Sequence, residues 1–396
     1  MKDYLFVAPF LRPPGGGEGV ANQMIQGLAR RGSLTVLTWE PPDFGRIDEY
    51  YGTELCQWPF EHRLVAPTLR RALLSARIPH EMLKLSVLMG RAKRLRKDYR
   101  HCFAAYNDLD LGPGAVNYLH YPCLDFRDLK SKPWPSHPLG KAIWPLYISA
   151  CLWPARWSVE GIRQSVILAN SHWSAQQYID HYQAPVHRVI YPPALGQPRP
   201  HDGPRKEAFL SIGRVDRSKG WSRLVSVIEK VRQSGHEVEL TLAGSRGDAK
   251  LLEELEALAA TRPWLNLALD LPREELDRLI ASHRFGLHGM IGEHYGMAVA
   301  ELVLGGCLTL VHNSGGQVEI ARHAAALYEN EADAVDKIRA LLERPELARE
   351  VAKVQAEHRE SLTRQAFVEN FDRFLDELDA GPIEPHFGPH RPATAP

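Results

Sequence analysis

Two carboxylates, Glu293 and Glu301, stand eight positions apart in the segment GEHYGMAVAELVLGG, residues 292–306. The residues from Met297 to Leu304 favour a helix, which Gly305-Gly306 would end. Glu293 then lies in the loop before this helix and Glu301 on its second turn. Glu301 has only apolar neighbours in the sequence, and a carboxylate in apolar surroundings is costly unless a partner meets it. The segment therefore predicts that Glu301 has a partner.

A polyhydroxylated ligand suits this segment. The residues His294-Tyr295-Gly296-Met297 lead into the helix, so that their N–H groups point out of a helix N-terminus, which favours an anion or a polar ligand. Glu301 could accept hydrogen bonds from a ribose diol and Glu293 from sugar hydroxyls, because each carboxylate oxygen accepts more than one bond. The alternative is a pair of solvated acids around a helix start.

Two cations follow another expected strand, in the segment GRVDRSKG at residues 213–220. Arg214 and Lys219 could converge on a diphosphate, the arginine as a planar fork and the lysine as a point charge. A solvated basic turn is the alternative interpretation.

Glycine-rich turns follow two of the expected strands. Gly15-Gly16-Gly17 with Gly19 follows the first strand, and backbone amides there can approach a phosphate closely. NSGG at 313–316 follows a later strand and could close one wall of a cleft or cap the next helix. GGGEG is not the GxGxxG of dinucleotide-binding proteins, however, and a flexible turn remains an alternative.

Three histidines and an acidic pair are candidate catalytic or metal-binding residues. His120 lies at the end of an expected strand, where a hydrogen-bonded structural role competes with catalysis. Asp108 and Asp110 resemble a metal-binding DxD, and His288 and His294 are also possible ligands. Neither group has the ligand count of a metal site, so we expect no metal.

The composition is that of a globular protein with about two domains. The chain has 396 residues, of which 44% are hydrophobic and 24% charged, and 48 Lys+Arg balance 48 Asp+Glu. This balance argues against a nucleic-acid partner. The five scattered cysteines fit a reducing cytoplasm. No signal peptide is recognisable, and the apolar run 142–155 is too short to span a bilayer.

Alternating strands and helices appear in two blocks separated by the proline-rich segment 190–206. We expect two doubly wound parallel sheets, which bind ligands at the carboxyl ends of their strands. The expected strands are 4–8, 34–38, 102–106, 115–119 and 166–169 in the first block, and 209–213, 238–243, 265–270, 284–288 and 308–312 in the second. The expected helices include 20–31, 219–233, 248–260 and 297–304.

The segment 63–100 is strongly basic, and tryptophans follow it at 134, 144, 153 and 157. Such a combination suits peripheral contact with anionic lipid headgroups or with a phosphate-bearing acceptor. A solvated helix face beside core tryptophans is the alternative.

Taken together, these motifs resemble the retaining glycosyltransferases of family 4 over nearly the whole chain. The likeness rests on the glycine loop, GRVDRSKG, the Glu293/Glu301 pair with HYG between, NSGG and a final helix. YLHYP, IYPP, GLHGMIGEHYG and VHNSGG look most like the GDP-mannose-dependent α-1,2-mannosyltransferases that extend lipid-linked oligosaccharides. The chain departs from that branch by lacking the N-terminal membrane helix of eukaryotic members and by having GMIG before Glu293.

The resemblance implies an α/β protein with the GT-B fold, in which two Rossmann-like domains face each other across a cleft. It implies an acceptor-side domain at 1–196, onto which a helix at 362–380 packs back, and a nucleotide-sugar domain at 205–360. Residues 381–396 are expected to form a disordered tail.

The resemblance also assigns roles to residues of the site. It places Arg214 and Lys219 on the donor diphosphate, Glu301 on the ribose and Glu293 on the transferred sugar, and His120 near the reaction centre. The implied donor-binding residues are Gly16, Gly17, Arg214, Lys219, Glu293, His294, Tyr295, Gly296, Met297 and Glu301, and the implied catalytic residues are His120, Glu293, Arg214 and Lys219.

The expected reaction is retaining transfer of mannose from GDP-mannose to a glycan or lipid-linked glycan, without a cofactor or an essential metal. Three alternatives stay open at this point. They are a UDP-sugar donor, a nucleotide-sugar-binding protein without turnover, and an NAD-dependent oxidoreductase, which also begins with a glycine-rich β-α-β unit.

Overall fold

The computed structural model describes residues 1–65, 81–131, 138–196 and 204–389. The chain forms two compact units, one made of Met1–Ile190 together with the residues from Val368 on, the other of Tyr191–Phe367. The first unit was expected to end at residue 196. It ends at Ile190 because the next residues bind to the second unit, where the Ala194 N–H donates to the Leu362 carbonyl at 3.0 Å.

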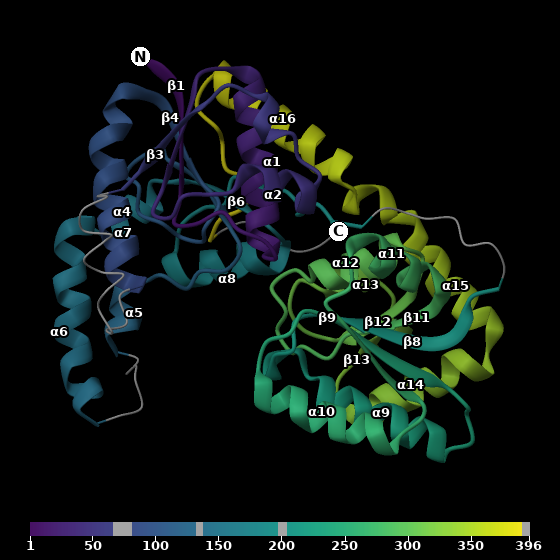
Figure 1. The fold of residues 1–396 in the computed structure, drawn as a ribbon. Helices are drawn as coiled ribbons and strands as arrows, with labels where there is room; N and C mark the ends of the chain where they lie inside the picture. Colours follow the sequence, from purple (N-terminus) through teal and green to yellow (C-terminus); the bar gives the residue numbers. More distant parts are fainter. Residues whose placement is uncertain (66–80, 132–137, 197–203, 390–396) are drawn as a thin grey trace. The chain divides into compact units, whose positions relative to one another are not determined.

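The first unit contains a parallel sheet of seven described strands in the order β3-β2-β1-β4-β5-β6-β7 (Figure 1). Strand β1, which lies inside the sheet between β2 and β4, is buried from Tyr4 onward, as its continuous apolar sequence predicts. The strands are β1 (Lys2–Ala8), β2 (Leu34–Thr38), β3 (Glu61–Leu64), β4 (Tyr99–Ala104), β5 (Val116–Leu119), β6 (Val166–Ala169) and β7 (Arg188–Val189). The described helices are α1 (Gly16–Arg31), α2 (Phe44–Tyr51), α4 (Glu81–Leu95), α5 (Phe126–Ser131), α6 (Pro138–Ala155), α7 (Val159–Arg163) and α8 (His172–Tyr182).

Helix α16 (Arg364–Ala380) completes the first unit from a distant part of the sequence and lies beside α1 (Figure 1). The ring of Phe371 is buried against Gly27, on which a Cβ would lie 3.2 Å from the ring. Arg31 of α1 pairs with Asp376 of α16 at 2.7 Å. The apolar face of the final helix thus packs against the first unit.

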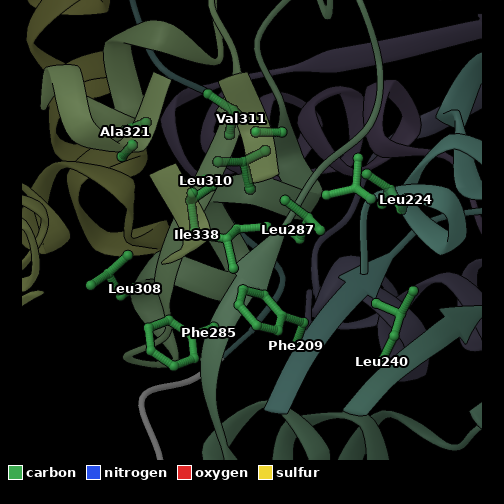
Figure 2. Packing of buried hydrophobic residues seen from close by; sticks show 14 of the residues in the cluster. Phe209, Leu224, Leu240, Phe285, Leu287, Leu308, Leu310, Val311, Ala321 and Ile338 are labelled. Atoms are coloured by element: carbon green, nitrogen blue, oxygen red, sulfur yellow. The ribbon is translucent and has the colours of Figure 1, made fainter. Parts of the chain in front are cut away.

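The second unit contains a parallel sheet of six described strands in the order β10-β9-β8-β11-β12-β13. Its core is apolar, with the rings of Phe209 and Phe285 stacked at 4.9 Å on neighbouring strands (Figure 2). The strands are β8 (Lys206–Ile212), β9 (Glu239–Gly244), β10 (Leu265–Leu269), β11 (His283–Leu287), β12 (Leu308–His312) and β13 (Leu327–Tyr328). The described helices are α9 (Trp221–Gln233), α10 (Ala249–Thr261), α11 (Arg273–Ser282), α12 (Met297–Leu304), α13 (Val318–Ala321), α14 (Glu331–Glu343) and α15 (Pro345–Glu357).

The strand order of the second unit reverses between β8 and β11, which are hydrogen-bonded neighbours. In an open parallel sheet, the loops that follow the two strands at such a reversal leave the sheet in opposite directions and create a crevice for ligands. Here those loops are 213–220 after β8 and 288–296 after β11. The fold therefore places the two cations and Glu293 at the same edge. The predicted class, α/β with two doubly wound parallel sheets, is confirmed.

Three local predictions differ from the structure. Helix α1 begins at Gly16 rather than at residue 20, and α11 occupies residues for which no helix was expected. Residues 381–389, expected to be disordered, are described: Phe387 exchanges two backbone hydrogen bonds of 3.0 Å with Val186. Phe387 is held there because its ring packs against the apolar cluster around α8. The rest of the expected tail, 390–396, lies outside the described residues.

Among the described residues, no helix combines the length and the apolar composition needed to cross a membrane.

Candidate active site

The turn after β8 is built to hold Lys219 in a fixed place. Asp216 accepts a hydrogen bond from the Ser218 N–H at 2.9 Å, and Gly220 ends the turn with a φ of +68°. A Cβ on Gly220 would lie 2.5 Å from the Gly289 carbonyl oxygen, so only glycine allows this close approach of the two loops. Lys219 is consequently held next to the loop that carries Glu293.

Lys219 and Glu293 form an ion pair. The Nζ of Lys219 lies 2.7 Å from Oε2 of Glu293, and Nε2 of His288 lies 3.2 Å from the same oxygen. Burial alone would raise the pKa of Glu293, but the hydrogen bond from His288 and the charge of Lys219 lower it well below its usual range. Glu293 is therefore a carboxylate, and neither Lys219 nor His288 was expected as its partner.

The NSGG turn, residues 313–316, is hydrogen-bonded to the loop that carries Glu293. The Gly316 N–H donates to the Glu293 carbonyl at 2.8 Å, and the Gly292 N–H donates to Oγ of Ser314 at 2.8 Å. The buried amide of Gln317 donates to the Met290 carbonyl at 2.9 Å. This turn fixes the backbone on both sides of Glu293.

Glu301 is buried on α12 and bound by Arg273, a residue not predicted to belong to the site. Oε2 of Glu301 accepts a hydrogen bond of 2.6 Å from Nη1 of Arg273. Arg273 also donates from Nε to Asp277 at 2.8 Å, one turn further along α11. Burial by itself lowers the pKa of Arg273, but the two carboxylates outweigh it and raise this pKa. The partner expected for Glu301 was a ribose; in the structure, Arg273 meets it.

The remaining predicted donor-binding residues of the second unit differ in how exposed they are. The side chain of Arg214 is 67% exposed and lies 3.9 Å from Asp216. Gly296 precedes α12 with a φ of +104°, and the helix begins at Met297, so its first N–H groups have no partner within the helix. Tyr295 is buried and its ring stacks on Tyr191 at 5.4 Å. His294 is partly buried, and burial lowers its pKa.

The first unit holds the other predicted residues. Gly16 and Gly17 are the first two residues of α1 rather than a loop before it. A Cβ on Gly17 would lie 3.0 Å from Nε2 of His120, so the start of α1 and the end of β5 are in contact. The structure thus brings these glycines to His120.

Asp108 and Asp110 have structural partners. Asp108 is buried, accepts from the backbone of Leu124 at 3.0 Å and is also bound by the Tyr182 hydroxyl. Asp110 is buried and pairs with Lys93 at 2.7 Å. Within the described ranges, no three His, Cys, Asp or Glu side chains come together as metal ligands would.

The chain is similar to a protein family, to curated relatives and to solved structures. The family described as "Glycosyl transferases group 1" matches residues 199–358. The GDP-Man:Man(3)GlcNAc(2)-PP-Dol alpha-1,2-mannosyltransferase of Eremothecium gossypii is 25% identical over 221 residues, which are 51% of this chain and 37% of that protein. The human protein of the same name is 24% identical over 177 residues, which are 39% of this chain and 35% of that protein. The chain thus matches little more than a third of the length of these relatives.

Solved structures resemble the chain over almost its whole length. HepE of Anabaena in complex with UDP and glucose has a TM-score of 0.63 at 15% identity, covering 96% of this chain and 100% of that one. WaaG, described as a glycosyltransferase involved in lipopolysaccharide biosynthesis, has a TM-score of 0.63 at 15% identity, covering 94% and 99%. At this identity the likeness shows the fold alone. The family match shows that residues 199–358 are similar to the group 1 glycosyl transferases of retaining family 4, and the solved structures show that the chain has the GT-B fold.

Proposed function

We propose that this protein transfers a hexose from a nucleoside diphosphate donor to an acceptor hydroxyl with retention of configuration, and that the donor is GDP-mannose. The observation that carries the proposal is the pairing of Lys219 with Glu293 at the strand-order reversal of the second sheet. A cation and an acid in contact, next to a helix N-terminus, can bind a phosphate and a sugar hydroxyl side by side.

The predicted donor-binding residues around this pair have distinct roles in the proposal. Arg214 and Lys219 bind the diphosphate, the amides from Tyr295 to Met297 bind phosphate and sugar hydroxyls, and Glu293 accepts hydrogen bonds from the transferred sugar. Stabilisation of the departing diphosphate by these cations and by the dipole of α12 is the main catalytic effect. The acceptor oxygen bonds to the anomeric carbon on the face from which the diphosphate departs, so no enzymic nucleophile is required. The departing phosphate takes the proton of the acceptor hydroxyl and thus serves as the base.

Lys219 must change partners when a donor binds. It is bound to Glu293 in the structure, at 2.7 Å. A diphosphate that takes Lys219 releases the carboxylate of Glu293, which then accepts hydrogen bonds from sugar hydroxyls. His288 keeps its place beside Glu293, at 3.2 Å, and orients the carboxylate during this exchange.

GDP-mannose is proposed as the donor and a lipid-linked glycan as the acceptor because the curated relatives bear the names of GDP-Man-dependent enzymes acting on a dolichol-linked glycan. A UDP-sugar is the second candidate donor, since HepE was solved with UDP and glucose. His120, Gly16 and Gly17 keep their expected roles near the reaction centre and on the donor as proposals.

We also propose peripheral contact with an anionic membrane. Helix α6 exposes large apolar side chains at helical spacing, with Ile143, Leu146 and Trp153 exposed by 51%, 71% and 86%. Arg156 follows one turn after Trp153 and is exposed, as are Arg91, Arg94 and Lys97 of the basic segment. An apolar stripe with a tryptophan and neighbouring cations suits a lipid interface.

Vesicle sedimentation tests this contact. The protein should sediment with vesicles containing phosphatidylserine, and Trp153→Ser should weaken the association. Equal sedimentation of the two proteins, or no sedimentation of the native one, would contradict the contact.

Turnover tests the proposed reaction. The protein is incubated with GDP-mannose or UDP-glucose, and the released sugar or product is followed by proton NMR at the anomeric position. The proposal expects release from GDP-mannose with the α-anomer appearing first. First appearance of the β-anomer would contradict retention, and preference for UDP-glucose would contradict mannose. Binding of donor without release, with or without an extract of lipid-linked glycans, would indicate a binding protein.

A further inference from the structure

We infer that Arg273 makes this site selective for a ribose, by holding one oxygen of Glu301 so that the other accepts from the sugar diol. The inference rests on the proposed function, because it concerns the nucleotide of the same donor. Nothing in the sequence motifs or the comparisons points to Arg273.

The guanidinium of Arg273 is held between carboxylates of two helices. Nη1 donates to Oε2 of Glu301 on α12 at 2.6 Å, and Nε donates to Oδ1 of Asp277 on α11 at 2.8 Å, with Nη2 on the same Asp277 oxygen. The side chains of Glu301 and Asp277 are only 8% and 4% exposed. A planar fork bound on both edges has one orientation, which a lysine ammonium does not provide. Glu301 is therefore fixed in direction before any ligand arrives.

One oxygen of Glu301 remains available. Oε2 is taken by Arg273, whereas none of the described residues donates a hydrogen bond to Oε1. A carboxylate oxygen accepts more than one bond. A vicinal diol can thus donate to Oε1 without displacing Arg273.

The hydrogen-bonding character of Glu301 selects the kind of ligand. Its second oxygen accepts hydrogen bonds, which a ribose diol can donate and an ionised phosphate cannot. The ammonium of Lys219 donates hydrogen bonds and carries a positive charge, so it has the opposite preference. The nucleotide is therefore oriented with its ribose toward Glu301 and its diphosphate toward Lys219.

The backbone at Gly196 closes the cluster on one side. A Cβ at this position would lie 2.9 Å from Nη2 of Arg273 and 3.9 Å from Cγ of Glu301. Glycine lets the chain pack directly against the guanidinium, which limits how far Arg273 can turn away. Arg273 thus acts as a positioning residue, because it works through Glu301.

Calorimetric titration with GDP, 2′-deoxy-GDP, UDP and 2′-deoxy-UDP tests this inference on the full chain. Wild type should bind the ribonucleotide of the preferred base about tenfold or more tightly than its 2′-deoxy form, since a hydrogen bond to a charged acceptor is lost. Arg273→Met should reduce this ratio to about threefold or less, while the affinity for the 2′-deoxy form changes little. Arg273→Lys keeps the charge without the fork and should also lose the discrimination.

Arg278→Met is the matched control, because Arg278 lies on the same helix, is 64% exposed and pairs with the exposed Glu274. It should keep the full discrimination. Arg273 variants that keep it, or that lose affinity for both forms equally, would overturn the inference, and so would a wild type that binds both forms alike. If wild type binds no nucleotide at all, the proposed function itself fails, which is a separate result.

Discussion

The pairing of Lys219 with Glu293 leads to a counterintuitive expectation for nucleotide binding. A diphosphate can use Lys219 fully only if this lysine leaves the carboxylate that lies 2.7 Å away. Glu293→Gln removes the competing charge and keeps the shape of the side chain. We therefore expect this variant to bind a nucleoside diphosphate more tightly than wild type does, although Glu293 belongs to the site.

The size of the effect follows from the geometry. At 2.7 Å and an effective dielectric constant of about 20, the gross attraction between the two charges is about 6 kcal/mol. The side chains of Lys219 and Glu293 are 23% and 14% exposed, and water and the bound diphosphate offset most of this attraction. Exposed pairs contribute up to about 1 kcal/mol and breaking buried pairs costs about 3–5 kcal/mol. A competition of about 1–2 kcal/mol corresponds to a five- to thirty-fold gain in affinity.

Calorimetric titration with GDP and UDP measures this gain. In a double-mutant cycle, Lys219→Met should abolish the effect of Glu293→Gln, since no lysine is left to release. Glu254→Gln is the control, because Glu254 pairs with the exposed Arg217 at 2.8 Å and its removal should change affinity little. Unchanged or weaker binding by Glu293→Gln would refute the exchange. If the gain in affinity persists in the Lys219→Met background, its cause is direct repulsion between the Glu293 carboxylate and the diphosphate, not release of Lys219.

Three further predictions concern the first unit. His120→Ala should lower turnover more than donor binding. Gly17→Ala should act in the same direction, because its Cβ would lie 3.0 Å from Nε2 of His120. Equal losses in kcat and in donor affinity would show that neither residue lies at the reaction centre. Phe371→Ala should cost about 3–5 kcal/mol of unfolding free energy, seen in urea unfolding, because it leaves a cavity in the core; a loss under about 1 kcal/mol would contradict its packing role. Burial lowers the pKa of His187 to about 4, so between about pH 6.5 and pH 4 the unfolded chain binds a proton that the folded protein does not bind. The Tm should therefore fall as the pH is lowered from about 6.5 to about 4, and it should fall less steeply in His187→Gln.

Much of the second unit could be predicted from the sequence because its signals are local. The helix Met297–Leu304 has the predicted bounds, since apolar helix formers and the following glycines determine it. In the first unit, the strand β2 likewise has its predicted bounds, Leu34–Thr38, because a short apolar run lies between turn signals. The positions of Glu293 before the helix and Glu301 on its second turn follow directly.

The partners of these acids could not be predicted, because they depend on strand order. Lys219 and Glu293 are 74 residues apart and meet only because β8 and β11 are neighbours in the sheet. Arg273 and Glu301 are 28 residues apart. The helix carrying Arg273 was missed, although Pro272 before it and Arg273 with Asp277 at i,i+4 spacing could have indicated it.

The role of Glu301 had to be revised for the same reason. Its apolar neighbours in the sequence showed that it needs a partner, but a sequence does not distinguish an internal cation from a ligand. The structure supplies Arg273, at 2.6 Å. The ribose is now proposed as a second partner, on the other oxygen.

Titration of the folded protein with GDP and UDP side by side, with Glu301→Ala as the control, tests the central claim most directly. We predict that at least one of the two nucleotides binds, with GDP preferred, and that Glu301→Ala weakens this binding about tenfold or more. Binding of neither nucleotide to wild type, or equal affinity of Glu301→Ala, would contradict a nucleotide site built around Glu301.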